Sequence, residues 1–292
     1  RAFGIGRTAR VMMITRFAPS PTGPLHLGHA YSAMVAHDMA RAAAGTFLLR
    51  IEDIDQGRAR AEWESQIFAD LQWLGLDWPR PVMRQSERME AYHAALDALW
   101  AAGLLYPCSC NRRDIEAAAR APQEGGEPLL GPDGIVYPGT CRHHPRPEKM
   151  PEDVPLRLDM ARALAHAGPL PPIVETGVAA VASTNGAAMI SGIGDVVLAR
   201  RGMGTSYHLA VVVDDADQGI THVVRGADLA EATPIHVLLQ RLLGHSSPTY
   251  HHHRLIRDEA GKRLAKRDDA RAIAAYRAEG ATPQDIRRMV GL

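Results

Sequence analysis

The stretch RFAPSPTGPLHLGHAYSA, which runs from Arg16 to Ala33, determines how the start of this chain is read. The apolar run at residues 11–18 predicts a buried strand, and the Pro-Ser-Pro-Thr-Gly that ends it predicts a sharp turn. Apolar side chains then recur at helical spacing from near Leu25 to about Ala44, so we expect a helix there. A glycine-bearing turn between a strand and a helix gathers backbone N–H groups at the positive end of the helix dipole, which suits a phosphate.

Two histidines, His26 and His29, stand in the first turn of that expected helix. Residues at this spacing share one helical face, so both imidazoles can donate hydrogen bonds to phosphate oxygens. A pair of zinc ligands on a helix and two ordinary surface histidines are the alternatives, because two histidines without a nearby carboxylate are a thin signal. The residue types and their spacing leave these alternatives open.

Strands and helices alternate along the rest of the chain and predict an α/β fold, a parallel sheet with crossover helices. The expected strands are 46–53, 195–201 and 221–226, the expected helices are 61–76, 86–105 and 234–244, and residues 207–215 form either a helix or a strand. Thr233 followed by Pro234 predicts an N-cap and the first residue of a helix. From Pro107 onward the chain is rich in Pro, Gly, Cys and His, which indicates an inserted module.

Composition and charge exclude several classes of protein. The 292 residues are 46% hydrophobic and 23% charged, which is typical of a globular chain. Lys plus Arg, 33, equals Asp plus Glu, 33, so we expect no DNA partner. No apolar run approaches the roughly 18 residues of a membrane helix, and the N-terminus lacks the apolar core of a signal peptide. We therefore expect a cytoplasmic protein without membrane contact. Separately, we expect a monomer.

The literal string at the two histidines carries a family resemblance. His26-Leu-Gly-His29 is similar to the HIGH signature of class I aminoacyl-tRNA synthetases, and the RFAPSPTG before it resembles the glutamyl and glutaminyl branch of that family. Four later segments resemble glutamyl-tRNA synthetase segments in the same order: LRIEDID (49–55), YHLAVVVDD (207–215), VVRGADL (223–229) and TPIHVLLQ (233–240). The resemblance covers residues 15–270 and implies a Rossmann-type class I synthetase catalytic domain.

The resemblance assigns a role to each part of the chain. Residues 12–105 and 191–245 are the expected halves of the catalytic domain, and 106–190 are an inserted module with a zinc site, similar to an acceptor-binding module. Residues 246–292 are a loop resembling KMSKS followed by a short helical region that resembles a stem-contact region. Little chain follows the end of the resemblance, so we expect no anticodon-binding domain.

A pocket for L-glutamate is implied by the same resemblance. Arg16 and Arg225 would pair with carboxylates, for which the planar guanidinium is better suited than an ammonium. Glu52 would bind the α-ammonium, and Tyr207 would hydrogen-bond the substrate. The other implied wall residues are Phe17, Ala18, Pro19 and Ser20. For any one of these charged residues the alternative is a surface ion pair.

The resemblance also implies ATP, accompanied by Mg²⁺, on the turn before the first helix. The residues expected to contact ATP are Pro24, His26, Gly28, His29 and Lys266. His26, His29 and Lys266 are the expected catalytic residues, because they would supply donors for the transition-state oxygens when the glutamate α-carboxylate attacks the α-phosphorus. Lys266 lies in RLAKR (263–267), where Arg263 is a further candidate for contact with ATP. This stretch departs from the KMSKS pattern at Ala265, where a hydroxyl is usual. A solvated basic loop is the alternative there.

Cys108, Cys110 and Cys141 offer soft ligands to a metal, and tetrahedral zinc needs one ligand more. The candidates are Tyr137, His143 and His144. Ligand statistics favour His143, because histidine is a far commoner ligand than tyrosine. The stretch YPGTC (137–141), however, resembles the tyrosine-containing zinc site of one glutamyl branch, which implies Tyr137 as the fourth ligand of a structural zinc. Plain thiols are the alternative.

The chain is short for a glutamyl-tRNA synthetase. In this it resembles a branch of the family whose members activate glutamate and transfer it onto queuosine in the anticodon loop of tRNA(Asp). The partners so implied are L-glutamate, ATP and tRNA(Asp) bearing queuosine. A catalytic fragment of an ordinary glutamyl-tRNA synthetase, which charges the 3′ end of tRNA(Glu), has the same pocket and is one alternative. A non-catalytic synthetase paralogue, suggested by Ala265, is the other.

Overall fold

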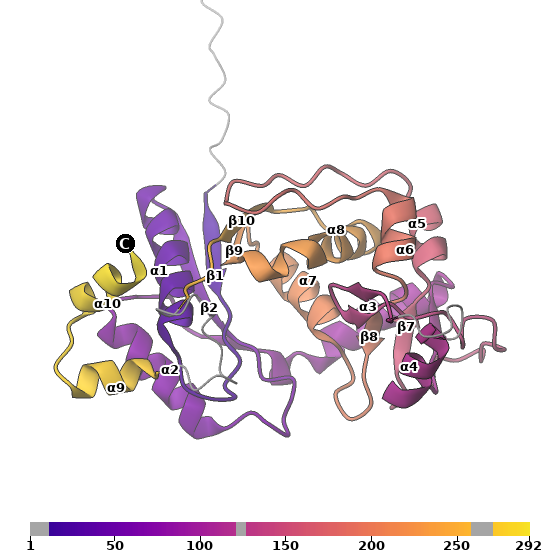
Figure 1. Cartoon of the computed structure of the whole chain (residues 1–292), viewed down its shortest axis with the longest axis horizontal. Coiled ribbons are helices and arrows are strands. Elements are labelled where there is room, and N and C mark those ends of the chain that lie inside the picture. Colours follow the sequence, from indigo (N-terminus) through magenta and orange to yellow (C-terminus); the bar gives the residue numbers. More distant parts are fainter. Residues whose placement is uncertain (1–11, 121–126, 258–270) are drawn as a thin grey trace, which may run out of the picture.

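A layer of parallel strands forms the centre of the molecule, seen here in a computed structural model that describes residues 12–120, 127–257 and 271–292 (Figure 1). β1 pairs with β2 and β2 with β3, while β9 pairs with β10, all in parallel. β9 runs beside β1, where the Thr221 N–H donates to the Ile14 carbonyl at 3.0 Å. The strands are β1 (Ile14–Phe17), β2 (Thr46–Ile51), β3 (Met83–Arg84), β9 (His222–Gly226) and β10 (Thr249–His253). The resulting order β3-β2-β1-β9-β10 confirms the expected α/β fold, and it reverses its winding between β1 and β9, where sheets of this kind bind ligands.

Helices cover this layer on both sides (Figure 1). α1 packs against β1, β2 and β9 and buries small and apolar side chains such as Ala33 and Met34. α7 packs against α3 and α8 in a second apolar core. The helices are α1 (Leu27–Ala42), α2 (Ala61–Trp73), α3 (Met89–Ala101), α7 (Tyr207–Asp217) and α8 (Thr233–Leu242). Residues 207–215, which the sequence left as helix or strand, are therefore helical, and the Ser206 hydroxyl caps them by accepting from the Leu209 N–H.

The segment between the two halves of the layer forms a smaller antiparallel sheet. Its strands are β4 (Leu105–Pro107), β7 (Leu156–Leu158) and β8 (Val197–Ala199), in the order β4-β7-β8. The expected strand at 195–201 is thus present as β8, but it pairs with β7 and not with the parallel layer. The remaining elements there are α4 (Arg112–Arg120), β5 (Leu130–Gly131), β6 (Gly134–Ile135), α5 (Met160–Ala167) and α6 (Gly186–Gly192).

A strap, which we define as residues 168–185, leaves α5 and crosses to β10 (Figure 1). Its middle adds to the edge of β10, because the Tyr250 N–H donates to the Val174 carbonyl at 2.8 Å and the Val178 N–H to the His252 carbonyl at 2.8 Å. Gly177 lies against that edge so closely that a Cβ would stand 2.2 Å from the His252 carbonyl oxygen. The strap therefore shields an edge strand that would otherwise expose unpaired backbone groups.

Two short helices follow, α9 (Ile273–Ala278) beside α2 and α10 (Pro283–Val290) beside α1 (Figure 1). α10 begins with a capping box between Thr282 and Asp285. Ile286 and Val290 on its inner face are buried in the same apolar core as α1. The ending of this chain is consequently packed into the α/β layer.

Two helix starts differ from the sequence-based expectation. Thr233 is not an N-cap, because the 3₁₀ turn η2 (Ala227–Ala232) runs directly into α8 and Thr233 is already helical. α3 begins at Met89, not at 86, because residues 85–87 form the 3₁₀ turn η1 (Gln85–Glu87), whose Ser86 N–H is bound by Asp53. Among the described residues, no helix has the length and apolar character needed to cross a bilayer.

Candidate active site

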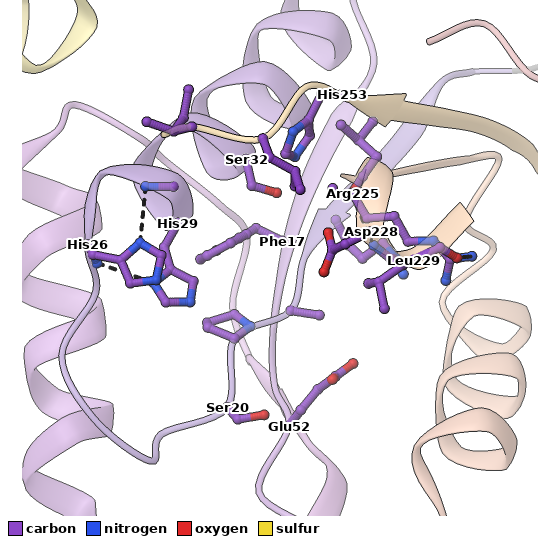
Figure 2. A pocket seen from close by; sticks show the side chains of 18 of the residues that line it. Phe17, Ser20, His26, His29, Ser32, Glu52, Arg225, Asp228, Leu229 and His253 are labelled. Carbon is purple, nitrogen blue, oxygen red and sulfur yellow. Dashed lines mark hydrogen bonds between the residues drawn. The ribbon is translucent and has the colours of Figure 1, made fainter. Parts of the chain in front are cut away.

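A cavity of about 440 Å³ opens at the carboxyl ends of β1 and β9. Figure 2 shows His26 and His29 on one side of it, Arg225 on the other, and Glu52 and Ser20 below. Its wall includes, of the residues expected from the sequence, Arg16, Phe17, Ala18, Pro19, Ser20, His26, Gly28, His29, Glu52, Tyr207 and Arg225. Pro24 does not line the cavity, and Lys266, with Arg263 and Ala265, lies outside the described residues. The fold therefore brings together side chains up to about 200 positions apart.

The turn before α1 fixes the orientation of both signature histidines. His26 is the N-cap of α1, and its Nδ1 accepts from the Gly28 N–H at 3.1 Å. His29 Nδ1 accepts from the His26 N–H at 3.2 Å, and the two ring centres are 3.8 Å apart. Because each Nδ1 is an acceptor, the neutral rings carry their proton on Nε2. His26 itself thus precedes the first helical turn, whereas the sequence placed it inside that turn.

Arg16 is already paired with an acid. Its Nε and Nη2 donate to the two carboxylate oxygens of Asp215 at 3.0 and 3.2 Å, and both side chains are buried. Arg50, fully buried, donates to Asp215 at 2.7 Å and to Glu52 at 3.1 Å. Burial raises the pKa of Glu52, which Arg50 and Arg16 partly counteract. Glu52 therefore stands at the cavity as one member of an interlocked group of cations and anions.

Arg225 has neutral partners. Its Nε donates to His252 Nε2 at 3.0 Å and its Nη1 to His236 Nδ1 at 3.0 Å. Nη2 donates to the Thr233 hydroxyl at 2.9 Å and to the Leu229 carbonyl at 3.2 Å. In the part of the chain that the structure describes, no carboxylate oxygen lies within 4.0 Å of this guanidinium. A buried cation of this kind favours an anion in the adjoining cavity.

Sequence reasoning missed most of the residues that surround these two arginines. Arg50, Asp214 and Asp215 lie within strings that carried the family resemblance, but nothing in their spacing reveals that they meet. His236 lies in a predicted helix and His252 in the observed strand β10, and neither has a motif of its own. One signal could have indicated these contacts: charged and imidazole side chains occur in elements that are otherwise apolar, and such groups are buried only when they have polar partners.

The loop that contains Lys266 is flanked by described residues that lie at the cavity. Leu255 and Ile256, just before it, line the wall. After it, Ala272 pairs with His26 in a backbone bridge, and the Ile273 N–H donates to the Leu25 carbonyl at 2.8 Å. The chain therefore leaves and re-enters the described structure beside the His26 turn.

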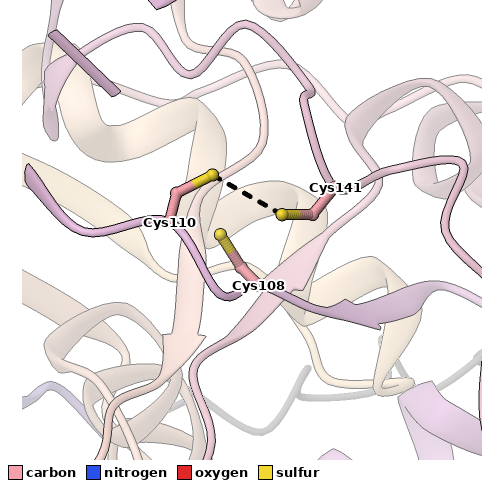
Figure 3. A group of neighbouring side chains, drawn as sticks. All are labelled: Cys108, Cys110 and Cys141. Carbon is pink, nitrogen blue, oxygen red and sulfur yellow. Dashed lines mark hydrogen bonds between the residues drawn. The ribbon is translucent and has the colours of Figure 1, made fainter. Parts of the chain in front are cut away.

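The cysteines converge in the inserted segment, with their sulfurs within 4.8 Å of one another (Figure 3). The Tyr137 hydroxyl lies 3.5 Å from Cys108 Sγ and 3.3 Å from Cys110 Sγ, and it accepts from the Cys141 N–H at 2.9 Å. His143, the alternative fourth ligand, is exposed and lines a separate cavity with Arg142 and Arg146. The donor set of three sulfurs and one phenol oxygen fits a tetrahedral zinc ion.

Arg157 adds positive charge to this cluster and was not anticipated. Its Nε donates to Cys108 Sγ at 3.3 Å, and its guanidinium lies 3.8 Å from the centre of the Tyr137 ring. Burial raises the pKa of the Cys141 thiol, but hydrogen bonds from Tyr137 and Ser109 outweigh it and lower that pKa to about 6. A thiolate, the form that binds metal, is therefore available at neutral pH.

Comparison with known proteins agrees with this fold and shows the family of the chain. Residues 12–153 and 174–292 match the family model for the catalytic domain of class I tRNA synthetases (E and Q), so the chain belongs to that family. A Rhodobacter capsulatus protein named glutamyl-Q tRNA(Asp) synthetase is 63% identical over 284 residues, which are 96% of this chain and 100% of that protein. One of the same name from Geobacter sulfurreducens is 42% identical over 271 residues, 92% of this chain and 80% of that protein. Within its class, the chain belongs with the glutamyl-Q tRNA(Asp) synthetases.

Solved structures give the same result for the fold. A glutamate tRNA ligase from Elizabethkingia meningosepticum, crystallised in complex with its amino acid, superposes with a TM-score of 0.71 at 28% identity. The match covers 96% of this chain and 60% of that one. This chain thus spans less than two thirds of that glutamate tRNA ligase.

Proposed function

We propose that this chain activates L-glutamate with ATP to glutamyl adenylate and transfers the glutamyl group onto queuosine of tRNA(Asp). The proposal depends on one cavity. Backbone and imidazole donors of a turn stand on one side of it, a buried guanidinium with neutral partners stands on the other, and the largely buried carboxylate of Glu52 lies below them (Figure 2). This set complements a triphosphate beside an amino acid with an extra carboxylate. The names of the relatives supply the acceptor.

Arg225 is the proposed partner of a glutamate carboxylate. Its hydrogen bond to the Tyr207 hydroxyl, 3.4 Å, is the longest of the hydrogen bonds that its guanidinium donates, and both groups line the cavity. A carboxylate placed there would accept from Arg225 Nη1 and from the Tyr207 hydroxyl, a charge-assisted arrangement. Arg16 would act on the other carboxylate at longer range, since Asp215 occupies its fork. Glu52 would bind the α-ammonium.

The turn at His26 is the proposed ATP site. The backbone N–H groups before α1 and the Nε2–H groups of His26 and His29 would donate to phosphate oxygens. Lys266, from the KMSKS-like stretch, would add a further donor. The glutamate α-carboxylate oxygen would attack the α-phosphorus, the bond to pyrophosphate would break, and the acyl adenylate would form without a protein nucleophile. Mg²⁺, when bound with ATP, neutralises phosphate charge.

We further propose the domain division given above, with residues 106–190 as an insertion that a structural zinc stabilises. Cys108, Cys110, Tyr137 and Cys141 would be its ligands, and the bond from Arg157 to Cys108 would offset negative charge at the thiolates. Bound zinc would cross-link segments of the chain and would take no part in the reaction at the cavity.

Transfer of labelled glutamate to tRNA(Asp) prepared with and without queuosine tests the proposal. Label should appear on the queuosine-containing tRNA alone, and it should be absent from tRNA(Glu). Equal labelling of both tRNA(Asp) samples would reject the queuosine assignment, and labelling of the tRNA(Glu) 3′ end would favour an ordinary glutamyl-tRNA synthetase. Glutamate-dependent ATP–pyrophosphate exchange without tRNA separates both enzymes from a non-catalytic paralogue, which would show none at saturating ATP.

A further inference from the structure

The partners of Arg225 are themselves connected to more distant groups. A guanidinium only donates, so His236 must accept at Nδ1 and His252 at Nε2. Burial, followed by the charge of Arg225, lowers the pKa of His236 well below its usual value, so this imidazole is neutral. Each ring therefore carries its proton on the nitrogen that points away from Arg225.

From His236 a chain of polar contacts runs to an acid of the inserted segment. His236 Nε2 lies 3.0 Å from His208 Nδ1, so the proton on His236 is donated to His208. His208 in turn carries its own proton on Nε2, which lies 3.4 Å from Asp133 Oδ1. Asp133 stands in the turn between β5 and β6. Every proton of this relay points from Arg225 toward the carboxylate.

A second, shorter relay starts at His252. Its Nδ1 donates to a carboxylate oxygen of Glu175 in the strap. The other oxygen of Glu175 accepts from the backbone N–H groups of Gly177 at 2.6 Å and His252 at 3.0 Å. Burial raises the pKa of Glu175, but these bonds outweigh it and lower that pKa, so the acid is an anion at neutral pH. This relay likewise ends on a carboxylate of the segment 106–190.

We propose that Asp133 and Glu175 are positioning residues for substrate recognition, acting on Arg225 through relays of neutral imidazoles. The inference rests on the proposed function, in which Arg225 binds a carboxylate of glutamate. A carboxylate directly on Arg225 would neutralise it and compete with the substrate, as Asp215 does at Arg16. Imidazoles orient the guanidinium without cancelling its charge, and the distant acids fix their tautomers.

The kinetic test uses Asp133, which is partly exposed and does not line the cavity of about 440 Å³. Together with Arg200 it lines a smaller neighbouring cavity, whose wall shares Glu52 and Tyr207 with the first. In glutamate-dependent ATP–pyrophosphate exchange, D133A should raise the KM for glutamate about 3- to 30-fold and leave the KM for ATP within about twofold. D133N should restore a KM near that of the unchanged chain, because the amide oxygen still accepts from His208. Arg200, 4.0 Å from Asp133, provides the matched control, and R200A should leave the KM for glutamate unchanged.

Three outcomes would overturn the relay: an unchanged KM in D133A, a D133N variant as impaired as D133A, or an R200A variant that reproduces the effect of D133A. The same pair of variants at the other acid, E175A and E175Q, tests the second relay by the same criteria. A common loss of kcat with no change in the KM for glutamate would indicate a structural role alone and would also contradict the proposal.

A second measurement does not depend on activity. Long-range ¹⁵N–¹H spectra of the histidine rings report which nitrogen carries the proton. We expect the Nε2–H tautomer at His208 and His236 and the Nδ1–H tautomer at His252. A proton on His236 Nδ1 would overturn the proposal, whatever the enzyme does. A chain with the expected tautomers but no glutamate-dependent exchange would instead reject the proposed function.

Discussion

Arg16 and Arg225 carry the same guanidinium but have opposite surroundings. The Asp215 carboxylate accepts hydrogen bonds from the guanidinium of Arg16, whereas imidazoles, a hydroxyl and a carbonyl surround Arg225. Both side chains are almost fully buried, with exposed fractions of 4% and 5%. The difference in charge compensation, and not the residue type, therefore makes Arg225 the stronger candidate for binding a substrate carboxylate.

Replacing Arg225 with alanine should separate binding of the two substrates. We expect R225A to raise the KM for glutamate about 100-fold, because a buried charge-assisted contact is lost, while the KM for ATP stays nearly constant. Pyrophosphate exchange measured over glutamate and over ATP concentrations gives both values. Arg41, two-thirds exposed on α1, is the control, and R41A should alter neither. Unchanged glutamate dependence in R225A would remove this residue from the pocket.

Asp70 on α2 predicts a pH-dependent loss of stability. Its carboxylate oxygens are buried without a hydrogen-bond partner, and the nearest cation, Arg277, is 3.8 Å away and partly exposed. Burial raises the pKa of Asp70 to about 6 from 3.8, although Arg277 partly counteracts it. In the folded state Asp70 thus keeps its proton at pH values where the unfolded state has lost it. The contribution of Asp70 to the free energy of unfolding therefore falls as the pH rises from about 4 through 6.

D70N should therefore stabilise the protein, relative to the unchanged chain, considerably more at pH 7.5 than at pH 4.5. The difference in the free energy of unfolding at pH 7.5 should be at most about 3 kcal/mol, since each pKa unit corresponds to about 1.4 kcal/mol. Urea unfolding at the two pH values measures it. D97N, at an exposed aspartate of α3, is the control. Equal stabilisation by D70N at both pH values would contradict the raised pKa.

At the scale of elements, periodicity and turn residues predicted the parallel layer and most of its helices, because each depends on neighbouring residues. The sequence failed where an element was decided by distant contacts. Thr233 has the composition of an N-cap, yet its hydroxyl accepts from Arg225, a bond that only the folded chain brings about. The partnership of His208 on α7 with His236 on α8 likewise depends on how these helices pack. The site strings were recognisable, but their electrostatic partners were not.

The cysteine cluster allows a test of which residue, Tyr137 or His143, is the fourth zinc ligand. Tyr137 lies among the sulfurs and His143 lies outside them, so Y137F should weaken zinc binding about 10- to 100-fold whereas H143A should leave it unchanged. Competition with a chromogenic chelator measures both affinities, and metal analysis of freshly purified protein gives the starting content. Protein without zinc would retire the metal site, and a loss of zinc in H143A alone would exchange the two ligands.

At the scale of the whole molecule, the inserted segment and the chain ending both lead back to the cavity. Asp133 and Glu175 reach Arg225 from the insertion, through the β5–β6 turn and the strap. The chain ending reaches the opposite side, where Ala272 pairs with His26. The two sides of the cavity are thus supported by segments that lie outside the halves of the parallel layer.

Ile286 tests whether the chain ending is part of the catalytic core. Its side chain is fully buried with α1, so I286A should lower the free energy of unfolding by about 2–5 kcal/mol through loss of apolar contact and the cavity left behind. Because α9 and α10 follow the bridge at Ala272, the variant should also raise the KM for ATP more than the KM for glutamate. Met289, half-exposed on the same helix, is the control, and M289A should change neither quantity. Thermal and urea unfolding measure the first effect and pyrophosphate exchange the second; unaltered stability would show that α10 is only peripherally attached.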